Sequence, residues 1–174
     1  TAAETGHLVL ATLHTGSAAQ TIDRIIDVFD ASQQAQIRVQ LAGSLRAVVC
    51  QTLVRCADGA GLVPALEILV TTAAIRRTIR DRETHLIPGM IETGSNLGMC
   101  AMDHSLACLV AQSRVSVDAA RARAVDPERF DKRVAPHRGP GARGVSPIGE
   151  RTDAPDPSPV QVEPLAAGGL KPWH

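Results

Sequence analysis

The sequence predicts an α/β fold followed by a helical region and a disordered tail, and three observations carry this prediction. Residues 8–13 form a short apolar run closed by turn residues, as in a strand buried on both faces of a parallel sheet. Amphipathic helical periodicity dominates residues 72–126. Nine of the eleven prolines lie from residue 127 onward, where too little apolar surface remains to offset the entropy of ordering.

Two helices are predicted directly after the first strand. Ser17 and Gln20 match a capping box. The residues that follow place an apolar stripe on one helical face: Ile22, Ile25, Ile26 and Phe29. A second helix is expected from about residue 32 to residue 49, with Ser32 as its N-cap.

A hairpin and further helices are expected along the rest of the chain. Two β-rich runs, residues 51–55 and 62–70, enclose a glycine-containing loop, and Pro64 favours an edge position. Thr72 is expected to cap a helix over about residues 73–82, and Ser116 a short one that ends before Pro127. Residues 88–98 contain either turns or a short helix with Pro88 in its first turn and Gly94 at its end. Between these segments lies another helix with an apolar face, made of Met99, Met102, Leu106, Leu109 and Val110.

Composition excludes several classes of function. Eighteen basic residues balance eighteen acidic ones, so nothing predicts a nucleic-acid partner. Aromatic residues make up 2 % of the chain, which leaves an aliphatic core and no platform for stacking bases. No run of about 18 apolar residues predicts a membrane span. The four cysteines, at positions 50, 56, 100 and 108, form no CxxC pair, so we expect reduced thiols and no zinc site.

Two histidines, His7 and His14, flank the first apolar run. On a strand, side chains seven positions apart face opposite sides, so these two are not expected to hold one metal ion. His14 lies at the carboxyl end of the predicted strand, where α/β sheets bind ligands. Spacing alone leaves two readings open: a ligand-binding histidine, or two polar strand ends with satisfied hydrogen bonds.

Several separated motifs, in order, resemble those of the type II/IV secretion ATPases. TAAETGH and TLHT, at residues 1–7 and 12–15, look like that family's histidine box, and residues 18–29 and QTL at 51–53 continue the likeness. AIRRTIRD, at residues 74–81, resembles the AIRNLIRE motif of the type IV pilus retraction (twitching motility) branch. TH at 84–85, IETG at 91–94 and LGM at 97–99 extend the resemblance, which covers roughly residues 1–130.

The resemblance implies a RecA-like P-loop NTPase that works as a homo-hexamer with ATP and Mg²⁺. It implies that His14 contacts the γ-phosphate of ATP and that His7 supports the same region. In this reading the contact between His14 and the γ-phosphate is lost when ATP is hydrolysed, and its loss allows the strand and the domain to move. The family further implies a cytoplasmic protein, peripheral to the inner face of the cell membrane, whose partner is an inner-membrane pilus platform protein.

The arginine helix has two readings. The resemblance implies a retraction motif made by Ala74, Ile75, Arg76, Ile79 and Arg80. The alternative is a solvated basic face in which Arg77 pairs with Asp81 at i, i+4. The sequence departs from the family pattern because Arg77, Thr78 and Asp81 stand in place of asparagine, leucine and glutamate.

The sequence contains no G-x-x-x-x-G-K-[ST] loop. We therefore expect a C-terminal piece of a longer ATPase: a partial RecA-like core without Walker A and Walker B over residues 1–71, a helical region over 72–126 and a tail over 127–174. Without the phosphate cradle, metal ligands and general base, the chain alone is expected to be inactive. An incomplete sheet would also leave a strand edge exposed beside residues 8–13.

Three functions stay open at this point. The leading one is an ATP-hydrolysing motor subunit, in fragment form, that drives pilus disassembly. A second is the pilus assembly or type II secretion ATPase of the same superfamily, which usually carries a four-cysteine zinc insertion that is absent from this sequence. The third is a non-catalytic remnant that retains only oligomerisation and partner binding.

Overall fold

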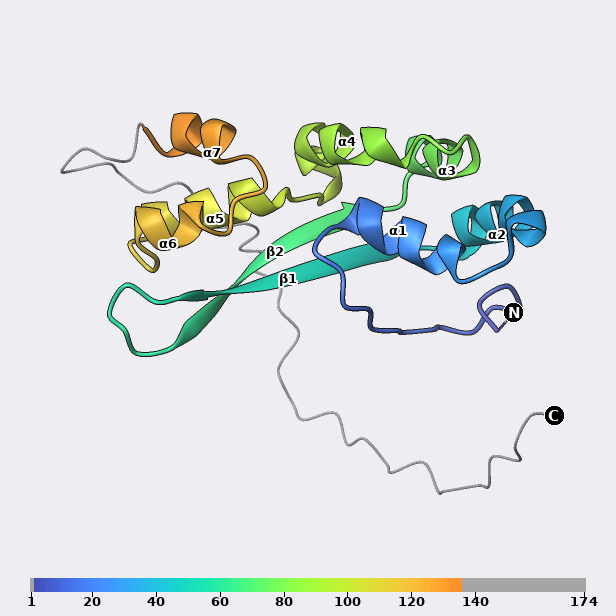
Figure 1. The fold of residues 1–174 in the computed structure, drawn as a ribbon, viewed down its shortest axis with the longest axis horizontal. Helices are drawn as coiled ribbons and strands as arrows, with labels where there is room; N and C mark the ends of the chain where they lie inside the picture. Colours follow the sequence, from blue (N-terminus) through green and yellow to red (C-terminus); the bar gives the residue numbers. More distant parts are fainter. Residues whose placement is uncertain (1, 136–174) are drawn as a thin grey trace, which may run out of the picture.

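The computed structural model describes residues 2–135, which combine one β-hairpin with helices (Figure 1). The elements in chain order are α1 (Ala18–Asp27), α2 (Ala31–Ser44), β1 (Ala47–Arg55), β2 (Leu62–Val70), α3 (Ala73–Arg80), η1 (Thr84–Leu86), α4 (Ile87–Thr93), η2 (Ser95–Leu97), α5 (Met102–Ala111), α6 (Val117–Arg121) and α7 (Pro127–Val134). The helices lie along the hairpin, with α1 to α4 near one end and α5 to α7 toward the other.

The hairpin prediction is confirmed, although β1 begins at Ala47 and not at residue 51. The strands pair antiparallel in an unbroken register from Ala47 opposite Val70 to Arg55 opposite Leu62. In the connecting loop the Asp58 carboxylate accepts a hydrogen bond from the Ala60 N–H, and Gly61 adopts φ +151°. Alternate residues of both strands point into the core, as expected for a sheet covered on one face.

The predicted strand over residues 8–13 is wrong. This segment is extended but belongs to no strand, and Leu8 and Leu10 are 83 % and 88 % exposed. A strand exists only when a neighbour completes its hydrogen-bond ladder, and none of the described residues pairs with this segment. The argument from opposite strand faces for His7 and His14 therefore lapses, and so does the expected strand edge at this place.

Helix α1 is confirmed with its cap, but Phe29 of the predicted stripe lies beyond the end of the helix and is 38 % exposed. Ser17 Oγ accepts from the Gln20 N–H, Gln20 Oε1 accepts from the Gly16 N–H, and Ile22 and Ile26 are fully buried. The second helix was predicted too long. Asp30 and not Ser32 occupies its N-cap position, without a hydrogen bond from the side chain to the helix, and the helix ends at Ser44. Val48 and Val49, which the predicted range placed at the end of this helix, lie in β1. Alternation along the strand buries Val48.

The two short helices after the hairpin follow the sequence closely. Thr72 Oγ1 accepts from the Ile75 N–H at the start of α3. Pro88 lies in the first turn of α4 and Gly94 at its end, which was one of the two alternatives. A Cβ on Gly94 would come within 2.5 Å of the Met99 Sδ atom and 2.9 Å of the Met90 carbonyl oxygen. Because the carbonyl belongs to the backbone and cannot move aside easily, this close approach requires glycine.

The C-terminal helices bring two corrections. Met99 precedes α5, which begins at Met102. Residues 127–134, assigned to the disordered tail, form α7: Asp126 caps the helix, and Phe130 and Val134 are fully buried. Two apolar side chains one turn apart suffice to dock a helix of this length, even in a proline-rich neighbourhood. The remainder of the predicted tail, residues 136–174, lies outside the described residues. Ser116 caps α6 as predicted.

Two groups of buried side chains form the core. The first core cluster consists of Ala18, Ile22, Ile26, Ala42, Val48, Cys50, Leu69, Ile75, Ile79, Ile87, Ile91 and Met99. The second core cluster consists of Val54, Val63, Ala65, Met102, Leu106, Ala107, Leu109, Val115, Ala120, Phe130 and Val134. Both clusters draw on residues before and after position 71, because the hairpin runs through both.

The described residues contain no helix long and apolar enough to cross a bilayer. All four cysteines are free thiols, as expected, and Cys56 alone among them is only half-buried.

Candidate functional site

The first histidine lies in a local turn near the chain start. The His7 N–H donates to the Ala2 carbonyl over 3.2 Å, and its Nδ1 atom lies 3.0 Å from Thr5 Oγ1. Gly6, at φ +91°, allows the chain to reverse there. His7 is exposed and does not line the hollow described next.

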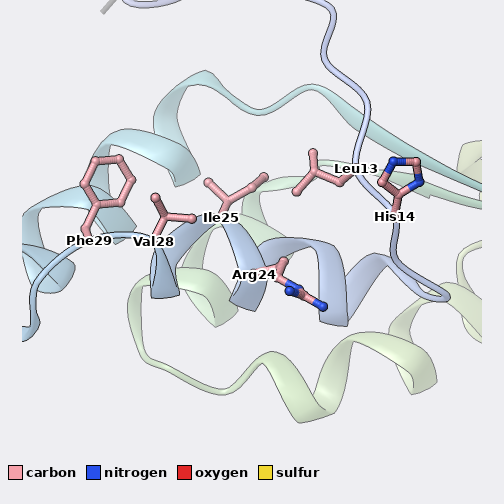
Figure 2. Close-up of a pocket in the computed structure, with 6 residues that line it drawn as sticks. All are labelled: Leu13, His14, Arg24, Ile25, Val28 and Phe29. Carbon is pink, nitrogen blue, oxygen red and sulfur yellow. The ribbon is translucent and has the colours of Figure 1, made fainter.

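The second histidine lines an open hollow between the N-terminal segment and α1 (Figure 2). The hollow measures about 550 Å³. Leu13 and His14 come from the extended segment, whereas the opposite wall comes from α1 and the residues that follow it: Arg24, Ile25, Val28 and Phe29. His14 is exposed and makes no hydrogen bond or ion pair with any residue in the described part of the chain. Its imidazole and the Arg24 guanidinium are thus the polar groups of a largely apolar surface.

A chain of hydroxyl groups fixes the residue next to His14. Thr21 Oγ1 donates to the Ser17 carbonyl over 2.8 Å, and the Thr15 and Thr21 hydroxyl oxygens are 2.6 Å apart. Because a hydroxyl has one proton, Thr15 is the donor in the second bond. The backbone that carries His14 is therefore anchored to the first turn of α1.

Beneath this anchor, the buried carboxylate of Glu67 holds the start of α1. Glu67 is 7 % exposed, and its Oε1 accepts from the Ala18 N–H over 2.7 Å. The same carboxylate accepts from the Met102 N–H at the start of α5. Burial raises the pKa of Glu67, and the nearby Asp103 adds to that, while the two backbone hydrogen bonds act against it. One side chain thereby satisfies the first turns of two helices.

A second tie connects α1 with the helical region. The Thr84 hydroxyl donates to the Asp23 carboxylate, with oxygen–oxygen distances of 2.9 and 3.2 Å. Asp23 precedes Arg24, so this contact also helps to set the wall of the hollow.

The arginine helix α3 divides into two faces. Ile75 and Ile79 are fully buried in the first core cluster, while Arg80 and Ala74 are exposed and Arg76 is half-exposed. Arg77 Nε lies 3.2 Å from Asp81 Oδ2, so the predicted i, i+4 pair is confirmed. Thr78, in the place of the family's leucine, is buried, and its hydroxyl donates to the Ala74 carbonyl over 3.1 Å.

The structure thus separates the residues that the sequence singled out. His14 lies in the hollow, His7 in a turn outside it, and the motif of α3 in neither place. Sequence reasoning missed Arg24 and Glu67. A glutamate in the middle of a β-rich run was the available signal for Glu67, because a buried carboxylate needs donors.

This arrangement fits part of a phosphate-binding site. An imidazole and a guanidinium beside an apolar wall can contact an anionic group that is joined to an apolar one. Among residues 2–135, however, no group of three His, Cys, Asp or Glu side chains is arranged to hold a metal ion. The described residues therefore do not fit Mg²⁺, and they contain no P-loop.

Comparison with known proteins places the chain in a family. Residues 1–87 match the model of the type II/IV secretion system protein family, and the chain belongs to that family.

Within the family, the similar proteins include pilus motors. The chain is 48 % identical over 130 residues to the type IV pilus retraction ATPase PilT of Pseudomonas aeruginosa, covering 75 % of this chain and 38 % of that protein. It is 47 % identical over 128 residues to a twitching motility protein of Neisseria gonorrhoeae, covering 74 % of this chain and 34 % of the relative. The crystal structure of the pilus retraction motor PilT with bound ADP superposes with a TM-score of 0.63 at 35 % identity, over 74 % of this chain and 36 % of that one. The chain thus spans a little over a third of the length of these relatives.

Proposed function

We propose that this chain acts as the C-terminal part of an ATP-driven motor subunit for type IV pilus retraction. The observation that carries the proposal is the 48 % identity with the PilT relative over three quarters of the chain. As in the family resemblance, the motor is a cytoplasmic RecA-like homo-hexamer, peripheral to the inner face of the cell membrane. It acts on an inner-membrane pilus platform protein, and ATP hydrolysis drives pilus disassembly.

In this proposal His14 contacts the terminal phosphate of ATP. Three features support the role: the ring is exposed, no described residue occupies its hydrogen-bonding atoms, and the positively charged Arg24 lines the same hollow. His7 supports the segment that carries His14. ATP supplies the phosphoryl group, and Mg²⁺ and the phosphate cradle come from residues that this chain does not contain.

The experiment is a chimera in which residues 1–135 replace the matching segment of the full-length Pseudomonas aeruginosa PilT. We expect the chimera to hydrolyse ATP, and we expect His14→Ala to lower kcat by about 10²-fold, the order seen when one preorganised donor to a developing charge is lost. His85→Ala, which removes an exposed histidine of η1, is the matched control and should leave kcat unchanged. Equal effects of the two substitutions would contradict the assignment of His14.

The α3 motif is proposed to act on retraction and not on hydrolysis, because Arg76 and Arg80 lie outside the hollow. In the same chimera, Arg76→Ala with Arg80→Ala should preserve ATPase activity and abolish twitching in cells. Arg123→Ala, at an exposed arginine far along the chain, is the control. Loss of ATPase activity in the double variant would place the motif in the catalytic machinery instead.

The second candidate, a non-catalytic partner-binding subunit, is favoured by the absence of a P-loop from the 174 residues. For the chain alone we expect no magnesium-dependent ATP hydrolysis. Mixed with full-length PilT, a partner-binding chain would stimulate or inhibit the ATPase in proportion to its concentration. A mixture with unchanged activity would argue against this candidate.

A further inference from the structure

A small cavity lies at the seam between the two core clusters, away from the hollow of His14. It measures about 170 Å³, and we call it the seam cavity. One wall contains Ile91 and Met99 of the first core cluster. The other comes from α5 and α7, which carry the second core cluster, through His104 and Arg133. Its volume equals about five or six water molecules at roughly 30 Å³ each. It is far smaller than the roughly 300–1,000 Å³ of sites for drug-sized ligands, so a whole nucleotide does not fit.

The positive charge of Arg133 has no acidic partner in the described part of the chain. Arg133 Nη1 donates to His104 Nδ1 over 3.1 Å, and this is the one hydrogen bond of its guanidinium with the described residues. The acid on the cavity wall, Glu92, pairs with another arginine: its Oε2 atom lies 2.5 Å from Nη2 of Arg129, whose Nε atom is also 4.0 Å from Asp126 Oδ2. Arg129 and Arg133 are one turn apart on α7.

The other titratable groups near the cavity are neutral or are engaged by backbone N–H groups. Burial raises the pKa of the Cys100 thiol, with smaller contributions from Cys108 and from Glu67, whose carboxylate accepts from two backbone N–H groups, so Cys100 stays protonated. Burial lowers the pKa of His104, and Arg133 lowers it further, so the ring is neutral and accepts at Nδ1. The other acid on α5, Asp103, accepts from the Val125 and Asp126 N–H groups. Arg133 is therefore the charged side chain of the cavity wall that has no acid at ion-pair distance among the described residues.

The cavity also offers a neutral donor. Ser95 of η2 lines the same cavity as Arg133, and its hydroxyl is engaged by no other described residue. The position of Cys100 is fixed because its N–H and carbonyl pair with Ile68 of β2 over 3.0 and 2.8 Å. A planar guanidinium with free N–H groups, a hydroxyl and a rigid wall together match an oxyanion.

We propose that the seam cavity binds a compact oxyanion of the inorganic phosphate class, held by the Arg133 guanidinium and the Ser95 hydroxyl. The site is distinct from the proposed contact between His14 and ATP and does not depend on it. Bound phosphate joins α7 to η2 across the seam and so stabilises the packing of the two core clusters against each other. Ligands that bind only the folded state raise stability by mass action.

The experiment measures the thermal midpoint of the full 174-residue chain against inorganic phosphate, with sodium chloride at equal ionic strength as the reference. We expect a saturable rise in the midpoint with phosphate and none with chloride. Arg133→Gln should abolish the rise, whereas Arg123→Gln, which removes the same charge from an exposed site, should retain it. Ser95→Ala should weaken the apparent affinity several-fold.

The proposal is overturned if Arg133→Gln and Arg123→Gln respond alike, or if chloride produces the same rise, because either result means general charge screening. If Arg133→Gln does not fold, Arg133→Lys replaces it. Lysine keeps the charge but loses the planar fork, so the affinity for phosphate should fall. In addition, the ring signals of His104 in the wild-type NMR spectrum should shift with phosphate along the same saturation curve. Unmoved signals would place the phosphate elsewhere.

Discussion

At the scale of single residues, Glu67 is a buried polar side chain that connects the starts of two helices. Its carboxylate is buried and accepts hydrogen bonds from the first N–H groups of α1 and α5. Burial disfavours its charged form, as the raised pKa indicates. What the fold requires at this position is therefore an acceptor of hydrogen bonds more than a negative charge.

This view predicts different outcomes for two substitutions of Glu67. Glu67→Ala leaves both N–H groups without an acceptor and should lower the free energy of unfolding by about 2–3 kcal/mol. Glu67→Gln keeps an acceptor oxygen and the side-chain volume, so it should cost less than about 1 kcal/mol. Urea denaturation followed by circular dichroism measures both. An equal loss in the two variants would show that the charge itself is needed.

At the scale of elements, α7 shows how little apolar surface is needed to order a segment of polar composition. Its eight-residue sequence is PERFDKRV, and apart from the proline only two of its side chains are apolar. Those two, Phe130 and Val134, are fully buried against the second core cluster. Arg129 and Arg133 on the same helix contact Glu92 and His104, which adds polar contacts to the docking.

Replacement of Phe130 tests the order of this segment. Phe130→Ala should lower the free energy of unfolding by about 3–5 kcal/mol, as expected for a fully buried phenylalanine. Lys132→Ala, at an exposed position of the same helix, should change it by less than about 0.5 kcal/mol. A phenylalanine variant as stable as the lysine variant would mean that the segment is not docked.

The sequence predicts correctly those helix starts and buried positions that depend only on neighbouring residues. Helix caps depend on residues within one turn, and the three caps Ser17, Thr72 and Ser116 were predictable. The same holds for the burial of Ile75 and Ile79, which are one turn apart on α3. The start of β1 was not, because Val48 and Val49 fit a helical stripe equally well. Only pairing with β2, some twenty positions away, decides between the two.

The candidate sites likewise contain residues that the sequence predicts and residues that only the fold brings together. His14 was predictable from motif resemblance, but its neighbour across the hollow, Arg24, depends on how the extended segment runs past α1. The seam cavity joins residues from α4, η2, α5 and α7, with no motif in common. No pattern confined to one segment predicts a site of that kind.

At the scale of the whole molecule, the extended segment leaves three consecutive apolar side chains uncovered. Leu8, Val9 and Leu10 are 83 %, 54 % and 88 % exposed, and Leu13 of the same segment lines the hollow together with Val28. Exposed apolar surface of this kind favours association. For the 174-residue chain we therefore expect concentration-dependent self-association.

Charged substitutions on the segment should suppress that association without affecting the fold. Leu8→Lys with Leu10→Lys should lower the weight-average mass in sedimentation experiments and change the free energy of unfolding by less than about 0.5 kcal/mol. Val125→Lys, at an exposed valine elsewhere, is the control and should leave the mass unchanged. If the control lowers the mass equally, net charge and not this surface governs the association.

The path of the hairpin through both core clusters has a mechanical consequence. Val48 and Leu69 anchor one end of the paired strands in the first core cluster, while Val54 and Val63 anchor the other end in the second. The pairing of the two strands is continuous from one end to the other, so the hairpin is a rigid connection between the two core clusters. A force applied to α1 is therefore transmitted through the hairpin to α5 and α7. Neither core cluster can rotate far relative to the other without bending the paired strands, because both clusters include residues of these strands.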